Sequence, residues 1–61
     1  MNYSTNELKI MNRACADKIE ELEMEMLNDD YPAIVFEAMK DYSIILKDRH
    51  KRVQNELDQR D

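Results

Sequence analysis

The chain has 61 residues, a net charge of −5, a single cysteine and no glycine. This length allows one domain at most, and a domain so small buries only about 60% of its unfolded surface. One cysteine excludes an internal disulfide, and with one histidine it argues against a zinc site within one copy. We therefore expect no metal and no cofactor, and we expect stability to come from self-association.

The charge and the hydropathy pattern limit the partners. A net charge of −5 disfavours tight, unaided binding to nucleic acid, because phosphates reward cationic surfaces. No apolar run approaches the roughly 20 residues that cross a bilayer. Residues 1–7 also lack the basic start and apolar core of a signal peptide. We therefore expect a cytoplasmic protein that has no membrane partner.

The first predicted helix covers residues 5–27. Ser4 and Glu7 have the spacing of a capping box, in which each side chain accepts a hydrogen bond from the other residue's backbone N–H. An apolar stripe with helical spacing follows, with Asn12 as its polar member: Leu8, Cys15, Ile19, Leu22 and Met26. Cys15 lies within this stripe, so we predict a packed core thiol rather than a nucleophile.

The second predicted helix covers residues 32–57 and follows a turn at 28–31. Pro32 suits the first turn of a helix, where a missing N–H has no cost. The second stripe has alternating spacings of three and four residues: Phe36, Met39, Ser43, Leu46, His50, Val53 and Leu57. Two long helices and a short turn predict an all-α, single-domain antiparallel hairpin.

The two stripes align with one register. Antiparallel partners have residue numbers with a constant sum, and here that sum is 61 or 62. The pairs are Met26 with Phe36, Leu22 with Met39, Ile19 with Ser43, Cys15 with Leu46, Asn12 with His50, Leu8 with Val53 and Thr5 with Leu57. Asn12 and His50 are thus predicted to form one polar layer that fixes the register.

The second helix has more apolar surface than one seam can cover. Val35, Ala38, Tyr42 and Ile45 lie outside the predicted seam, so we expect them to form a dimer interface. Acidic residues crowd 18–30 and basic residues crowd 47–52. Two hairpins docked head to tail would set acid against base twice, which favours a dimeric four-helix bundle.

No catalytic constellation is present. His50 has no acidic neighbour that would make a dyad, and we expect no enzyme activity. A basic cluster is a possible binding site for nucleic acid or for an acidic protein: Lys47, Arg49, Lys51 and Arg52. The simpler interpretation is a solvated helix face that the acids of the first helix neutralise.

The length and the predicted hairpin resemble the Rop family of plasmid RNA-binding proteins, which are helical hairpins that pair into four-helix bundles. That resemblance implies RNA binding through basic residues around an exposed Phe on the first helix. Lys9 and Arg13 are the basic residues available here, but residues 5–27 contain no Phe, so no functional residue is carried over. The chain also resembles small accessory proteins of phages and mobile elements.

Two functions are therefore expected from the sequence. The first is a homodimeric helical adaptor or regulator that binds and modulates another protein, because apolar surface is in excess and catalytic residues are lacking. The alternative is a Rop-like RNA-binding protein, on the evidence of Lys9, Arg13 and the basic cluster.

Overall fold

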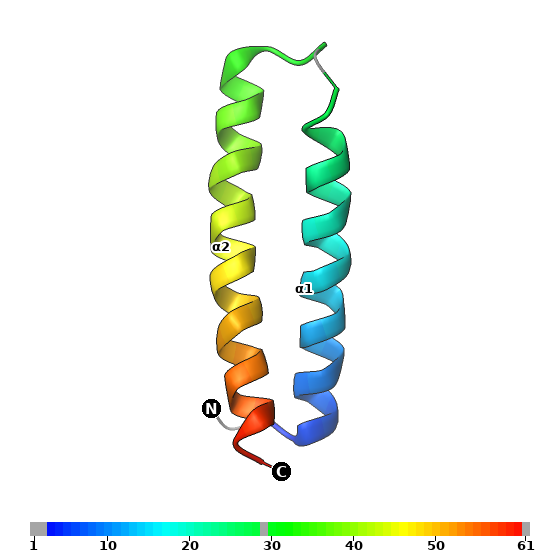
Figure 1. The fold of residues 1–61 in the computed structure, drawn as a ribbon, viewed down its shortest axis with the longest axis vertical. Coiled ribbons are helices and arrows are strands. Elements are labelled where there is room, and N and C mark those ends of the chain that lie inside the picture. The colour runs from blue at the N-terminus through cyan, green and yellow to red at the C-terminus, as the bar shows by residue number, and fades with distance from the viewer. Residues whose placement is uncertain (1–2, 29, 61) are drawn as a thin grey trace.

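A computed structural model describes residues 3–28 and 30–60 as two helices, α1 (Thr5–Glu25) and α2 (Ala33–Asp58). They run antiparallel, side by side, with the turn at one end and the start of α1 beside the end of α2 at the other (Figure 1). The hairpin is 44 Å long and 14 Å across. The predicted all-helical hairpin is confirmed, and the described residues contain no strand.

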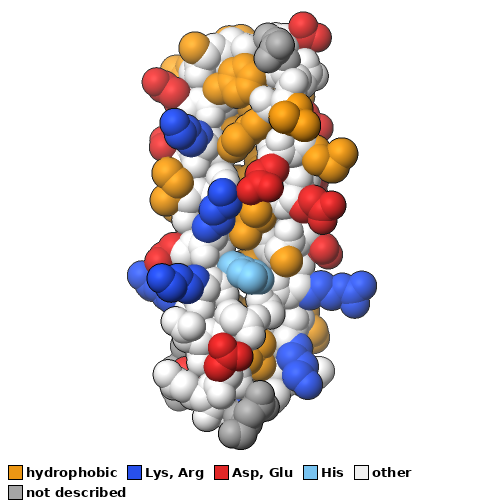
Figure 2. Space-filling model, viewed as in Figure 1, with side chains coloured by type: hydrophobic (Ala, Val, Ile, Leu, Met, Phe, Trp, Pro, Cys, Tyr) orange, Lys and Arg blue, Asp and Glu red, His pale blue; other side chains and the backbone are white. Residues whose placement is uncertain are grey.

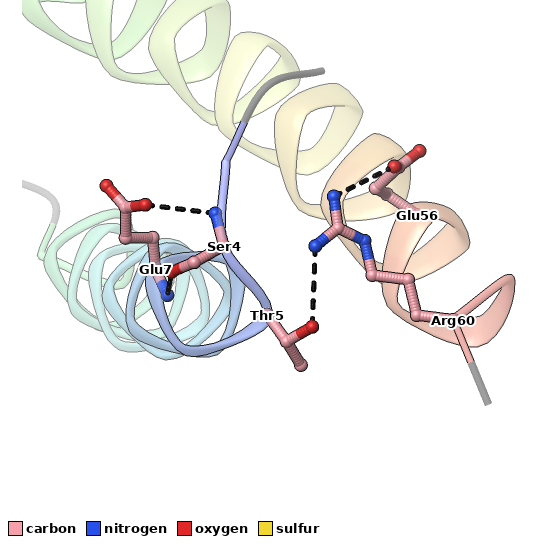
Figure 3. Close-up of polar contacts among 5 residues, drawn as sticks. All are labelled: Ser4, Thr5, Glu7, Glu56 and Arg60. Carbon is pink, nitrogen blue, oxygen red and sulfur yellow. Dashed lines mark hydrogen bonds and ion pairs between the residues drawn. The ribbon is translucent and has the colours of Figure 1, made fainter.

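The capping box starts α1 as predicted. The Ser4 backbone N–H donates to Glu7 Oε1 at 2.9 Å, and the Glu7 backbone N–H donates to Ser4 Oγ at 3.1 Å (Figure 3). Each bond satisfies a backbone donor that has no partner within the helix. The bond from the Ser4 backbone also lowers the pKa of Glu7 from its usual 4.5, because it stabilises the carboxylate.

The turn differs from its predicted limits by one or two residues. Helix α1 ends at Glu25, two residues before 27, because the Leu27 and Asn28 N–H groups bond three residues back, to Met24 and Glu25. Asn28 Oδ1 then accepts a bond from the Asp30 N–H at 3.0 Å, and Asp29 lies outside the described residues.

Pro32 caps α2 rather than forming its first turn. Its φ of −59° suits a helix, but its ψ of 153° is extended, as at an N-cap. Its carbonyl accepts the N–H groups of Val35 and Phe36. The helix therefore begins at Ala33, one residue later than predicted, and it ends at Asp58, one residue beyond the predicted end.

The core is the single seam between the helices. Leu8 and Val53 are fully buried at the open end, and Cys15, Leu22 and Leu46 form a cluster with Ile19 and Met39 packed against it. This clustering agrees with the predicted pairing of Cys15 with Leu46 and of Leu22 with Met39. Cys15 is buried, in the core position that its place in the stripe predicted.

A substitution in the capping box tests whether it stabilises the start of α1. Replacing Ser4 with Ala removes the acceptor for the Glu7 N–H and should lower the free energy of unfolding by about 0.5–2 kcal/mol. Chemical denaturation at one fixed protein concentration measures the change, since self-association shifts apparent stability. Asn6→Ala, in the same exposed turn but outside the capping bonds, is the matched control and should have no such cost. Equal midpoints for Ser4→Ala and wild type would contradict the role of the cap.

Candidate interaction surface

An apolar strip runs along α2 beside the core seam. It consists of Val35, Ala38, Tyr42 and Ile45, whose spacing of three and four residues keeps them on one side of a helix. Val35 is half-buried and Ala38 is exposed, while Tyr42 and Ile45 retain 45% and 54% exposure. The four predicted interface residues therefore lie together on the surface of the free hairpin.

An open groove of about 440 Å³ continues this strip toward the open end of the hairpin. Its lining comes from both helices and from the residue before the cap: Tyr3, Met11, Ile45, Asp48, Arg49, Arg52 and Val53. Arg52 Nε is 3.0 Å from Asp48 Oδ2, whereas Arg49 has no acidic partner among the described residues. The groove thus combines apolar walls with one cation that is not engaged in an ion pair there.

Sequence reasoning missed Tyr3 and Met11 as parts of this surface. Met11 is next to the seam residue Asn12, and its spacing from Ala14 and Lys18 places all three on one flank of α1. That flank and the apolar strip of α2 face the same side, because Met11 and Ile45 line one groove. The spacing of three and four residues on the first helix is the signal for Met11, whereas Tyr3 lies before α1 and has no such signal.

The basic cluster does not form one patch. Successive residues of a helix point about 100° apart, so Lys47, Arg49, Lys51 and Arg52 surround α2. Lys47 Nζ lies 3.2 Å from Glu23 Oε1 across the seam, and Arg52 pairs with Asp48 on its own helix. Figure 2 shows one face of the hairpin, on which both Lys or Arg and Asp or Glu side chains are exposed. Two of the four cations are therefore already partly neutralised.

Asn12, which is predicted to form a polar layer with His50, makes its hydrogen bond to a different residue. Asn12 Nδ2 donates to Gln54 Oε1 at 2.8 Å, and Gln54 Nε2 donates to Asp58 Oδ1 at 3.0 Å. Asn12 Oδ1 is buried and accepts no hydrogen bond from the described part of the chain. His50 is half-buried, and the chain's one histidine is drawn over the seam in Figure 2. The expected bond between Asn12 and His50 is thus replaced by one to Gln54.

The direction of helical side chains explains the replacement. Each side chain leans toward the N-terminus of its own helix. In an antiparallel pair, residues at the same level therefore lean apart, as Asn12 and His50 do. Gln54 lies one turn nearer the open end than His50 and leans back toward the turn, while Asn12 leans toward the open end. The two amides converge, which level-by-level pairing does not predict.

The turn end is acidic and partly apolar. The Tyr31 hydroxyl donates to Glu25 Oε2 at 2.6 Å, and this bond to a carboxylate raises the pKa of Tyr31. The Tyr31 ring also packs edge-on against Phe36, with centroids 6.1 Å apart. Beside them, Leu27 is 81% exposed and Ile34 is 74% exposed. In Figure 2, hydrophobic side chains gather near this end of the hairpin.

Comparisons with known protein families, with curated proteins and with solved structures find no match to this chain. Across residues 3–28 and 30–60, neither helix is both long enough and apolar enough to pass through a membrane.

The Asn12–Gln54 bond is testable by a double-mutant cycle. Gln54→Leu leaves the half-buried Asn12 amide without an acceptor and should cost about 1–3 kcal/mol, as should Asn12→Leu. The double change should recover part of this loss, because two apolar groups can replace a hydrogen-bonded pair. The cycle is measured by unfolding in denaturant.

The control is the same cycle with His50→Leu in place of Gln54→Leu. The effects of Asn12→Leu and His50→Leu on the free energy of unfolding are expected to add to within about 0.5 kcal/mol. Stronger coupling of Asn12 to His50 than to Gln54 would contradict the bonding described above.

Proposed function

We propose that this chain is a non-enzymatic helical adaptor, which forms a homodimeric four-helix bundle and binds and modulates another protein. The observation that carries the proposal is the apolar strip of Val35, Ala38, Tyr42 and Ile45 on the surface of α2. A hairpin of two helices covers one stripe of each helix, so a second apolar stripe needs a second partner. Contiguous apolar patches on small soluble proteins commonly mark interaction sites.

Self-association is supported by the thin core of the hairpin. The fully covered side chains of the described residues are those of the single seam, and only Leu8 and Val53 among them are near-zero in exposure. A chain of this size gains little from one such seam. Docking of a second copy on the apolar strip would enclose a larger core among the helices of both copies, as in other small bundles.

Binding to a second protein is supported by the apolar residues that lie outside the strip. Met24 is 66% exposed and is near Leu27 in sequence, at the acidic turn end. Apolar side chains within an acidic surround suit a protein partner whose surface is apolar and basic. The proposal requires no cofactor, and it assigns the protein to the cytoplasm.

Rop-like RNA binding is the alternative, and it rests on Lys9 and Arg13 of α1 and, within the basic cluster, on Arg49 and Lys51. These four cations have no ion pair among the described residues. Arg49 and Lys51 point to different sides of α2, however, and a nucleic-acid site needs several cations on one face. The adaptor function is therefore the one we propose.

Introducing negative charge into the apolar strip tests the homodimer. Tyr42→Glu with Ile45→Glu should give monomers with much less helix, because carboxylates cannot be buried unpaired in the new core. Static light scattering at high micromolar concentration and circular dichroism measure the two effects. Ile44→Glu is the matched control, since Ile44 is similarly accessible but about 100° around the helix from Ile45. A monomeric wild type under these conditions would refute the dimer.

The protein-binding surface is tested by affinity capture from extracts of the source cells. A protein retained by the wild type should be lost with Met24→Ser and Leu27→Ser together and kept with Ile44→Ser, while all three proteins stay dimeric. A parallel gel shift with RNA at low salt tests the alternative. Salt-sensitive RNA binding at micromolar protein, with no retained protein, would overturn the adaptor function.

A further inference from the structure

The apolar strip is half of a longer stripe along α2. Continuing its spacing of three and four residues toward the end of the helix leads to Arg49, Arg52 and Glu56. The stripe is therefore apolar from Val35 to Ile45 and charged beyond it. A second copy that covers the apolar half must bring its own apolar half to the same place, and this constrains how two copies can dock.

We propose that two copies dock head to tail, with the turn end of each hairpin over the open end of the other and α2 antiparallel to α2 of the second copy. This inference rests on the homodimer proposed above and specifies its geometry. On the side of the hairpin that docks, Glu21 and Glu25 lie toward the turn end, whereas Arg49 and Arg52 lie toward the open end. Docking with the turns together would oppose acid to acid, and a two-fold axis would then apply that penalty twice.

The register follows from the limits of the apolar half. Residues 35–45 are centred on residue 40, so superposing this segment on itself in reverse makes facing residue numbers add to 80. Val35 then faces Ile45 of the second copy, and Ala38 faces Tyr42. Ala38 opposite Tyr42 sets a small side chain against a large one, which lets two helices interdigitate. No apolar member of the strip is left opposite a charge.

The same register gives Arg49 a partner that was not used to choose it. Arg49 lies just beyond the level of Ala33, the first residue of α2 of the second copy, and there Tyr31 holds its hydroxyl 2.6 Å from the Glu25 carboxylate. The guanidinium of Arg49, which has no ion pair among the described residues, thus meets an aromatic ring and a carboxylate together. Cations bind favourably to both groups.

The same docking covers the turn-side part of the groove at the open end. The groove wall at Ile45 faces the start of α2 of the second copy, which carries the exposed Ile34. On α1, the seam register places residues 21–22 level with residue 40, so Lys18 falls near Glu25 of the second copy. Met24 points away from this contact by helical spacing, and it remains free for the protein partner.

Disulfide trapping tests the orientation. In a Cys15→Ala background, which removes the natural thiol, one chain carries both Val35→Cys and Ile45→Cys. These positions are about 15 Å apart along one helix, too far to pair within a chain. Head-to-tail docking should give covalent dimers in which peptide mapping finds the thiol introduced at position 35 joined to the one introduced at position 45. Each single-cysteine variant is a matched control and should give few covalent dimers.

A second variant covers the case in which the strip does not tolerate cysteine. Lys18→Cys with Glu25→Cys in the same background alters only exposed or half-buried positions of α1. It should yield disulfides that join position 18 of one copy to position 25 of the other.

The outcomes separate the two proposals. Disulfides between like positions, in which position 35 pairs with itself and position 45 with itself, would overturn the head-to-tail orientation while leaving a dimer. If light scattering shows a dimer but neither double-cysteine variant forms any disulfide between copies, the register is wrong. A wild type that is monomeric by light scattering would remove the homodimer itself, and this inference with it.

Discussion

The seam between α1 and α2 is the constraint on which the rest of the molecule depends. It buries Leu8, Val53 and the cluster around Cys15, and it holds both helices at one level. Most of the stability of a helix in a protein comes from such packing of its apolar face. Because two cylinders meet along one line only, the seam leaves every other apolar residue at the surface. The strip, the groove and the exposed turn end are consequences of that geometry.

Charged residues are distributed unevenly along the hairpin. Acids crowd residues 18–30 near the turn, and bases crowd residues 47–52 toward the open end. Among the described residues, one interhelical ion pair, Lys47 with Glu23, joins the two regions within a copy. An exposed pair of this kind contributes little stability. Its larger effect is on which surfaces can approach each other, because a two-fold axis repeats each favourable or unfavourable contact. In the dimer that we propose, the charge distribution would therefore act on docking more than on the stability of the hairpin.

Most of the fold was predictable because its signals are local or periodic. The capping box at Ser4 depends on two residues three apart, and the seam depends on stripes that repeat along each helix. The bond from Asn12 to Gln54 was not predictable from level-by-level pairing, since it depends on the opposite lean of side chains in antiparallel helices. The predicted start of the second helix at Pro32 is one residue too early, because the φ angle of proline suits both an N-cap and a first turn. The groove was not predictable from the sequence because its lining combines residues from separate segments, such as Tyr3 and Val53.

The polar residues of the seam bear on the dimer that we propose. A polar side chain in such a seam weakens packing but favours the register in which it finds a partner. Here Asn12 reaches Gln54 only at the observed level, and a slip of one heptad would bring it opposite Ser43 or Leu57. Such a slip would also move Met11 and Lys18 relative to the strip on α2, so the shared surface would no longer match a second copy. The bond that selects the register of one hairpin therefore also aligns the two halves of the surface through which we propose that it dimerises.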